Sequence, residues 1–180
     1  MQKLEKIKKI VNILIKIRRW CALKKMKFAI VICRVKGVQI GERCRFTGIP
    51  DVGSEPYLIK LGNDVILTDG IKFLTHDGGI RVFTGEKNFS HVNKLGKIEI
   101  KDNSFIGANS ILLPNIEIGP NSIVGAGSVV TKSIPPNTVY AGNPAKFICT
   151  LEEYIEKCNL NTIDIDVKDK EKIKNYFWNK

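Results

Sequence analysis

The most constraining feature of this sequence is an internal repeat with a period of six residues. An aliphatic residue occupies every sixth position at Ile100, Ile106, Leu112, Ile118, Val124 and Val130. Four residues after each of these stand Ser104, Ser110, Ile116, Ser122, Ser128 and Ile134. Helical faces recur about every 3.6 residues and strand faces about every two, so this period indicates a short strand and a turn, repeated in one orientation. Such a unit buries its apolar residues by stacking on copies of itself, which predicts a solenoid.

A looser form of the repeat begins near Val38. It places apolar residues six apart at Ile40, Phe46, Val52 and Leu58. The register then slips by three residues, to Leu61, Leu67 and Phe73. The slip predicts a bulge or corner loop around residues 56–60. The period then fails until Ile100, so we expect an excursion loop at 77–97. Loops that project from a repeat scaffold commonly carry function.

The strings IGANSI, IGPNSI and VGAGSV are followed by VTKSIPPNTVYAGNPAK. These motifs resemble the hexapeptide-repeat acyltransferases, and in particular the galactoside, maltose and polysaccharide-modifying O-acetyltransferases. The resemblance covers about residues 38–148. It implies a mainly β fold, a left-handed parallel β-helix with three hexads to a coil. It also implies acetyl-CoA as cosubstrate and a homotrimer with its sites between subunits.

The chain divides into three expected parts: a basic amphipathic segment at 1–36, the β-helix domain at 37–148 and a helical tail at 149–180. In the first part, helical spacing of three or four residues separates Leu4, Ile7, Ile10, Val11, Leu14, Ile17 and Cys21. In the tail, Thr150-x-x-Glu153 has the form of a capping box that starts a short helix. A second packed helix is expected between residues 161 and 180.

The net charge of +11 lies entirely at one end of the chain. Residues 1–36 hold twelve Lys and Arg and a single acid, Glu5, while the rest of the chain holds 17 basic and 17 acidic side chains. A neutral repeat body argues against nucleic-acid binding. For the basic segment two interpretations stay open: its apolar stripe packs on the β-helix or a neighbouring subunit, or it lies on an anionic membrane.

Acetyl transfer to a hydroxyl needs a base for the proton and donors for the tetrahedral oxyanion. An imidazole suits the base role, and the chain offers His76 and His91. His76 stands in LTHDGG and matches the Thr-His that the family places before its loop, so the resemblance implies that His76 is the general base. We expect His91 to be a solvated loop residue. Asp69 and Asp77 are the candidates for orienting the imidazole or binding the acceptor.

The resemblance places coenzyme A along the groove between the coils of neighbouring subunits. The matching positions are Ala108, Ala126, Thr131, Lys132 and Lys146. Small residues let pantetheine approach the backbone, and lysines suit phosphates. No metal site is expected, because the five cysteines lack C-x-x-C spacing. The γ-class carbonic anhydrases share the fold but require three zinc histidines, and this chain has two histidines.

The resemblance implies an O-acetyltransferase that acts on a sugar of a surface polysaccharide or its precursor. One alternative is an acetyltransferase for a small soluble sugar or amino sugar, since one histidine base serves O- or N-transfer. An alternative of another class is a non-catalytic β-helix scaffold for assembly. No apolar run approaches the roughly 20 residues of a membrane span, and no signal peptide is indicated. We therefore expect a cytoplasmic protein, with contact to the inner face of the membrane if the basic segment binds lipid.

Overall fold

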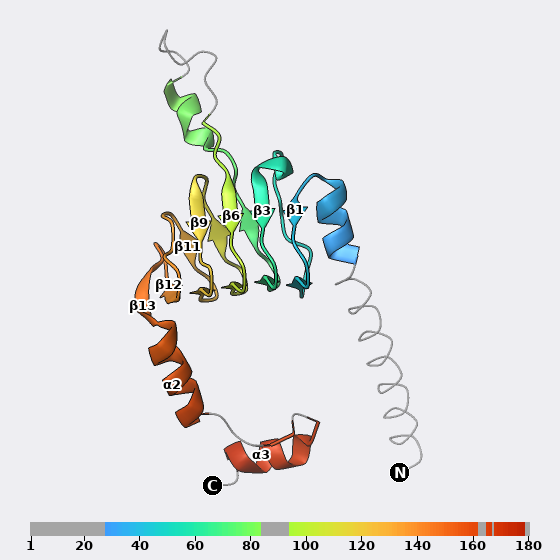
Figure 1. Cartoon of the computed structure of the whole chain (residues 1–180), viewed down its shortest axis with the longest axis vertical. Coiled ribbons are helices and arrows are strands. Elements are labelled where there is room, and N and C mark those ends of the chain that lie inside the picture. The colour runs from blue at the N-terminus through green and yellow to red at the C-terminus, as the bar shows by residue number, and fades with distance from the viewer. Residues whose placement is uncertain (1–27, 84–93, 162–164, 167, 179–180) are drawn as a thin grey trace.

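The computed structural model describes residues 28–83, 94–161, 165–166 and 168–178. Most of the helix predicted for the N-terminal segment, and His91 with it, lies outside these residues. The described chain winds into stacked coils built from short parallel strands, flanked by helical segments (Figure 1). This arrangement confirms the left-handed parallel β-helix that the hexads predict.

The three central coils each contribute one strand to each of three sheets. The first sheet contains β1 (Gln39–Ile40), β3 (Ile59–Leu61), β6 (Ile98–Ile100) and β9 (Ile116–Ile118). The second contains β2 (Arg45–Phe46), β4 (Ile66–Leu67), β7 (Phe105–Ile106), β10 (Ile123–Val124), β12 (Thr138–Ala141) and β13 (Lys146–Thr150). The third contains β5 (Lys72–Phe73), β8 (Ile111–Leu112) and β11 (Val129–Val130). Only the pairing of β12 with β13 is antiparallel among these strands.

The coils differ in length where the repeat slips. Phe105 pairs with Ile123, 18 residues further on, whereas Arg45 pairs with Ile66, 21 residues further on. The three extra residues of the first coil form the 3₁₀ turn η1 (Pro56–Leu58). This turn confirms the corner loop predicted around residues 56–60.

The apolar ladder of the hexads forms the core. All six aliphatic residues from Ile100 to Val130 are fully buried. The serines at the fourth hexad position are also buried, and their hydroxyls donate to backbone carbonyls at the corners. Ser110 Oγ lies 2.7 Å from the Gly107 oxygen, and Ser128 Oγ lies 2.6 Å from the Gly125 oxygen. Because each hydroxyl finds an acceptor, the polar groups are tolerated inside the coil.

Helical residues adjoin both ends of the stack. Residues 28–35 are helical and bury Ala29 and Cys33 against the first coil. At the other end β13 leads into α2 (Leu151–Asn161). The predicted capping box is confirmed, because the Glu153 amide donates to Thr150 Oγ1 at 3.1 Å and the Thr150 amide donates to Glu153 Oε2 at 2.8 Å.

The tail ends in α3 (Lys170–Trp178), the second helix that the sequence predicts. None of the described residues of α3 is buried, so the packing expected for it is not seen within the described chain. None of the helices in the described ranges has the length and apolar character to span a membrane.

Candidate active site

His76 lies at the corner that follows β5, where the chain leaves the third sheet. The excursion begins there with the 3₁₀ helix η2 (Gly78–Phe83) and returns at Leu95. The two ends of the excursion are joined by backbone pairing, since His76 bridges Leu95 and the Gly96 amide donates to the Thr75 carbonyl at 2.8 Å. The backbone of His76 is thereby held against the coil while its side chain stays 48% exposed.

A carboxylate from the coil below holds the imidazole. Glu55 Oε2 lies 2.9 Å from His76 Nδ1 and 2.7 Å from the hydroxyl of Thr75, which is fully buried. Ser54 Oγ lies 3.4 Å from the same imidazole nitrogen. Two adjacent residues of the second coil thus converge on one oxygen of Glu55.

These contacts determine the ionisation of Glu55 and the tautomer of His76. Hydrogen bonds from Thr75, His76 and Ser54 lower the pKa of Glu55 from 4.5 to about 2, so Glu55 is a carboxylate at neutral pH. An ionised carboxylate accepts hydrogen bonds and donates none. Therefore His76 Nδ1 carries the hydrogen donated to Glu55, and the lone pair of neutral His76 lies on Nε2. That nitrogen is the one free to accept a proton from a substrate.

Glu55 is the site residue that the sequence reasoning missed. It lies 21 residues before His76, the same offset that pairs Arg45 with Ile66 in the first coil. Counting one coil of 18 residues back from His76 leads instead to Leu58. The three-residue slip in the repeat was the signal that would have corrected the count.

The two aspartates singled out by the sequence make no hydrogen bond to His76 within the described chain. Asp77 accepts from Lys94 Nζ at 2.6 Å and from the Gly79 amide at 3.0 Å, so it pairs across the base of the excursion and starts η2. The Lys94 ammonium lowers the pKa of Asp77. Asp69 is exposed at the corner between β4 and β5, before the third sheet, whereas His76 follows that sheet.

Ala108 and Ala126 occupy the same corner as Asp69, in later coils. The pairing of Leu67 with Ile106 and of Ile106 with Val124 stacks the three positions. Neither Ala108 nor Ala126 donates a hydrogen bond from its backbone N–H to any group of the described chain. Two small residues with free amide donors fit the close approach of a pantetheine arm.

Thr131 and Lys132 follow β11 and are exposed at the corner after the third sheet, two coils above Leu74. Lys146 is exposed at the start of β13. The third sheet therefore separates His76, Thr131 and Lys132 from the corner of Ala108 and Ala126. One chain does not bring all the predicted site residues together.

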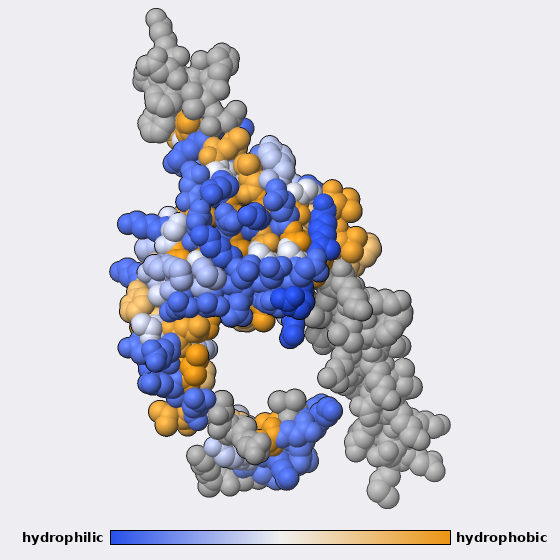
Figure 2. Space-filling view, viewed as in Figure 1, coloured by the Kyte–Doolittle hydropathy of each residue, from blue (hydrophilic) through white to orange (hydrophobic). Residues whose placement is uncertain are grey.

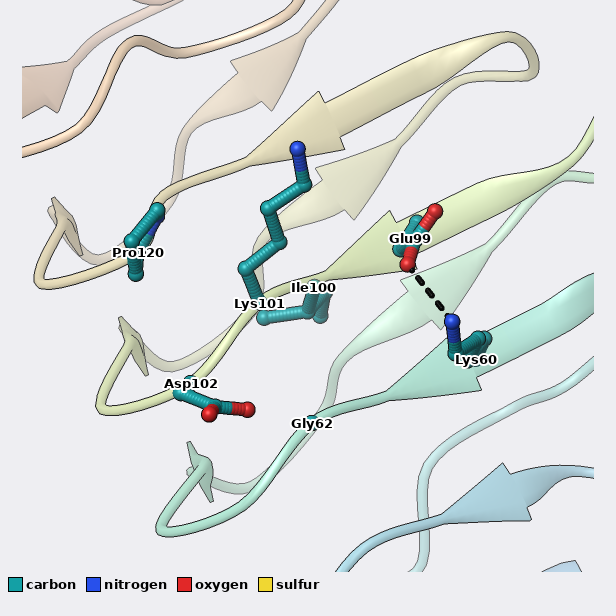
Figure 3. Close-up of a pocket in the computed structure, with 7 residues that line it drawn as sticks. All are labelled: Lys60, Gly62, Glu99, Ile100, Lys101, Asp102 and Pro120. Atoms are coloured by element: carbon teal, nitrogen blue, oxygen red, sulfur yellow. Dashed lines mark hydrogen bonds and ion pairs between the residues drawn. The ribbon is translucent and has the colours of Figure 1, made fainter.

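The outer face of the first sheet carries a separate shallow pocket, lined by Lys60, Gly62, Glu99, Ile100, Lys101, Asp102 and Pro120 (Figure 3). Its charges are paired: Lys60 Nζ lies 2.9 Å from Glu99 Oε1, and Lys101 Nζ lies 2.9 Å from Glu117 Oε2. The pocket includes none of the predicted site residues. Within the described ranges, no three His, Cys, Asp or Glu side chains gather as metal ligands.

The family model described as bacterial transferase hexapeptide (six repeats) matches residues 97–132. Protein CapG of Staphylococcus aureus is 52% identical over 126 residues, which is 69% of this chain and 72% of that protein. The putative acetyltransferase YvoF of Bacillus subtilis is 30% identical over 122 residues, which is 67% of this chain and 64% of that protein.

Two solved structures match part of the chain. Soybean serine acetyltransferase is 30% identical with a TM-score of 0.48, and the match covers 62% of this chain and 40% of the soybean chain. A maltose O-acetyltransferase from Clostridium difficile is 26% identical with a TM-score of 0.45, and the match covers 72% of this chain and 88% of that chain.

Proposed function

Because this chain belongs to the hexapeptide-repeat transferases, and so to a family of acyltransferases, we propose that it moves an acetyl group from acetyl-CoA to a sugar hydroxyl. The acceptor is a sugar of a surface polysaccharide or its precursor. The acceptor class rests on the resemblance of the hexads and of LTHDGG to sugar O-acetyltransferases. We assign the whole site to residues 37–148.

The observation that carries the proposal is the ordered pair of Glu55 and His76 at an exposed corner. His76 Nε2 accepts the proton of the acceptor hydroxyl as its oxygen bonds to the acetyl carbonyl carbon. Glu55 stabilises the imidazolium that forms, because its pKa of about 2 keeps it anionic. The carbon–sulfur bond then breaks, and the imidazolium returns the proton to the leaving thiolate.

The carrier needs a groove, donors and phosphate partners, and the residues present fit these needs. The free amides of Ala108 and Ala126 supply donors for pantetheine, and one of them is the candidate donor to the oxyanion. Lys132 and Lys146 are exposed and carry the positive charge that phosphates require. Acetyl-CoA supplies the activated acetyl group as a thioester.

A homotrimer completes this site. The outer face of the first sheet is charged and internally paired, and Figure 2 shows this face as largely hydrophilic over β3, β6 and β9. Outer positions of the other two sheets are instead mostly apolar and partly exposed, at Ile66, Phe105, Ile111, Ile123 and Val129, and the charged exceptions Arg45 and Lys72 lie in the first two coils. Covering these faces with two further copies would bring the corner of His76 in one subunit to the corner of Ala108 and Ala126 in the next.

The test is mass spectrometry of candidate glycans after incubation with the enzyme and isotopically labelled acetyl-CoA. The labelled acetyl group should appear on a sugar oxygen. His76→Ala should lower turnover by at least about a hundredfold while the affinity for coenzyme A changes little. Near-wild-type turnover by His76→Ala would contradict the assignment of His76 as the base. Failure to label any glycan would contradict the proposal that the acceptor is a sugar.

A further inference from the structure

The helical residues 28–35 expose an apolar stripe that no described residue covers. Phe28, Val31 and Val35 are 62%, 53% and 83% exposed. In Figure 1 this helix, in blue, lies beside β1 at one end of the stack of coils, and Figure 2 shows a hydrophobic patch at the same end. Three neighbouring apolar side chains this exposed on one helix mark an interaction surface rather than scattered surface residues.

The stripe and the buried face of the helix point in different directions. Phe28, Val31 and Val35 follow helical spacing on one side, while Ala29 and Cys33 are buried against the coil on another. The helix therefore caps the core with one face and turns a second apolar face away from the coils. Capping of the core explains why Ala29 and Cys33 are apolar. It does not explain why Phe28, Val31 and Val35 are apolar.

Basic residues flank this stripe in the sequence. Lys36 and Arg34 are exposed, and the sequence just before the helix contains Lys24, Lys25 and Lys27. The same register upstream holds further apolar residues, at Ile10, Leu14, Ile17 and Cys21. Residues 1–36 carry the whole net charge of +11, and the rest of the chain is neutral.

We propose that the stripe of Phe28, Val31 and Val35 docks this protein on an anionic lipid surface. An apolar face with basic flanks is the combination that holds a helix in the plane of such a surface, with the apolar side chains in the acyl boundary and the lysines at the headgroups. The occupant must be anionic. A second copy would carry the same basic sequence, and like charges repel.

This surface is independent of the acetyl-transfer site but consistent with it. If the protein is the trimer proposed above with its coils side by side, the threefold axis turns the three stripes toward the same side. Three stripes on one side would bind a planar surface together, and multivalent contact raises the apparent affinity without any new interaction.

The experiment is co-sedimentation of the full-length protein with vesicles of phosphatidylglycerol and phosphatidylcholine, and with vesicles of phosphatidylcholine alone. Binding should be strong to the anionic vesicles at low salt and should fall as salt is raised, since added ions screen the lysines. The double variant Val31→Glu, Val35→Glu should lower the partition coefficient at least about tenfold, because it places two carboxylates against the anionic headgroups. The matched control Ile155→Glu, Leu160→Glu makes the same exchange at exposed positions of α2 and should bind like wild type.

Thermal melting followed by circular dichroism establishes that the variants fold. If the double variant unfolds, the single variant Lys36→Glu replaces it as the test, with Lys174→Glu as its control. Lys36→Glu should weaken vesicle binding and Lys174→Glu should not. Wild-type binding by the stripe variants, or equal binding to both kinds of vesicle, would overturn the proposal. Light scattering without vesicles gives a further decisive outcome. If wild type forms a large assembly and the stripe variants do not, the stripe contacts a second copy of this chain instead of lipid.

Discussion

At the corner of His76, one carboxylate governs both the orientation and the tautomer of the imidazole that we propose as the base. Glu55 reaches His76 Nδ1 at 2.9 Å and is itself held by the buried hydroxyl of Thr75 at 2.7 Å. Oriented bases of this kind need a partner that fixes which ring nitrogen carries the hydrogen. The role of Glu55 in the proposed reaction is therefore positioning, exerted through His76.

Glu55→Gln tests this role at the residue scale. The amide can donate to Nδ1 and so stabilises the wrong tautomer, which should lower kcat by about tenfold or more. The KM for acetyl-CoA should not change, because Glu55 does not line the corner of Ala108 and Ala126. Nitrogen-15 NMR of the imidazole should show Nδ1 losing its hydrogen. Glu152→Gln on α2 is the control, and an equal loss of activity there would contradict the assignment.

At the scale of the coil, stacking leaves little room between neighbouring backbones. A Cβ atom added at Gly107 would lie 2.4 Å from the Ala126 nitrogen and 2.6 Å from the Gly125 carbonyl carbon. Both contacts involve backbone of the next coil, which cannot move without disturbing the ladder of strands. The absence of a side chain at Gly107 thus lets this coil lie at its observed spacing from the next.

Gly107→Ala should therefore lower the free energy of unfolding by about 1–3 kcal/mol, the usual cost of overpacking. Thermal unfolding measures the effect. The control is Gly78→Ala, because a Cβ at Gly78 meets nothing within 4 Å. An equal melting temperature for Gly107→Ala and wild type would show that the coils separate easily at this point.

Charges link successive coils on the outer face of the first sheet. Lys101 and Lys97 lie 2.9 and 3.0 Å from Glu117 and lower the pKa of Glu117 from 4.5 to about 2. A folded-state pKa below the unfolded one means that this stabilisation is complete above about pH 4.5 and is lost as the pH falls toward 2.

Glu117→Gln should remove that part of the acid sensitivity. The melting temperature of wild type should fall more steeply than that of the variant between pH 4.5 and 2. At neutral pH the difference should stay within about 3 °C, because the pair is exposed and salt screens it. Parallel curves for the two proteins would show that the ion pairs contribute no stability.

For the whole molecule, the unequal outer faces predict the oligomer. Light scattering should give three times the chain mass of 20.2 kDa. Ile111→Glu places a charge on an apolar outer position and should yield inactive monomers, since the proposed site takes residues from two subunits. Glu117→Gln changes the equivalent position of the charged face and should remain trimeric. An active Ile111→Glu monomer would show that one chain holds a complete site.

The local pattern of residues was enough to predict much of the molecule. The hexads predicted the β-helix and its buried ladder, the slip after Leu58 predicted η1, and Thr150-x-x-Glu153 predicted the start of α2. Such features depend on residues a few positions apart, and their physical cause is therefore legible in sequence. His76 was chosen through the resemblance of LTHDGG to the family's motif before its loop, and its role stays a prediction.

Contacts between coils were decided by the tertiary structure. Whether Glu55, Asp69 or Asp77 meets His76 depends on the length of each coil and on which corner each residue occupies, and a three-residue turn changed that register. The same holds for the cap helix, where burial of Ala29 and Cys33 left Phe28, Val31 and Val35 facing outward. A period shows that residues face inward together, while the side chain that each one meets is set by how the coils stack.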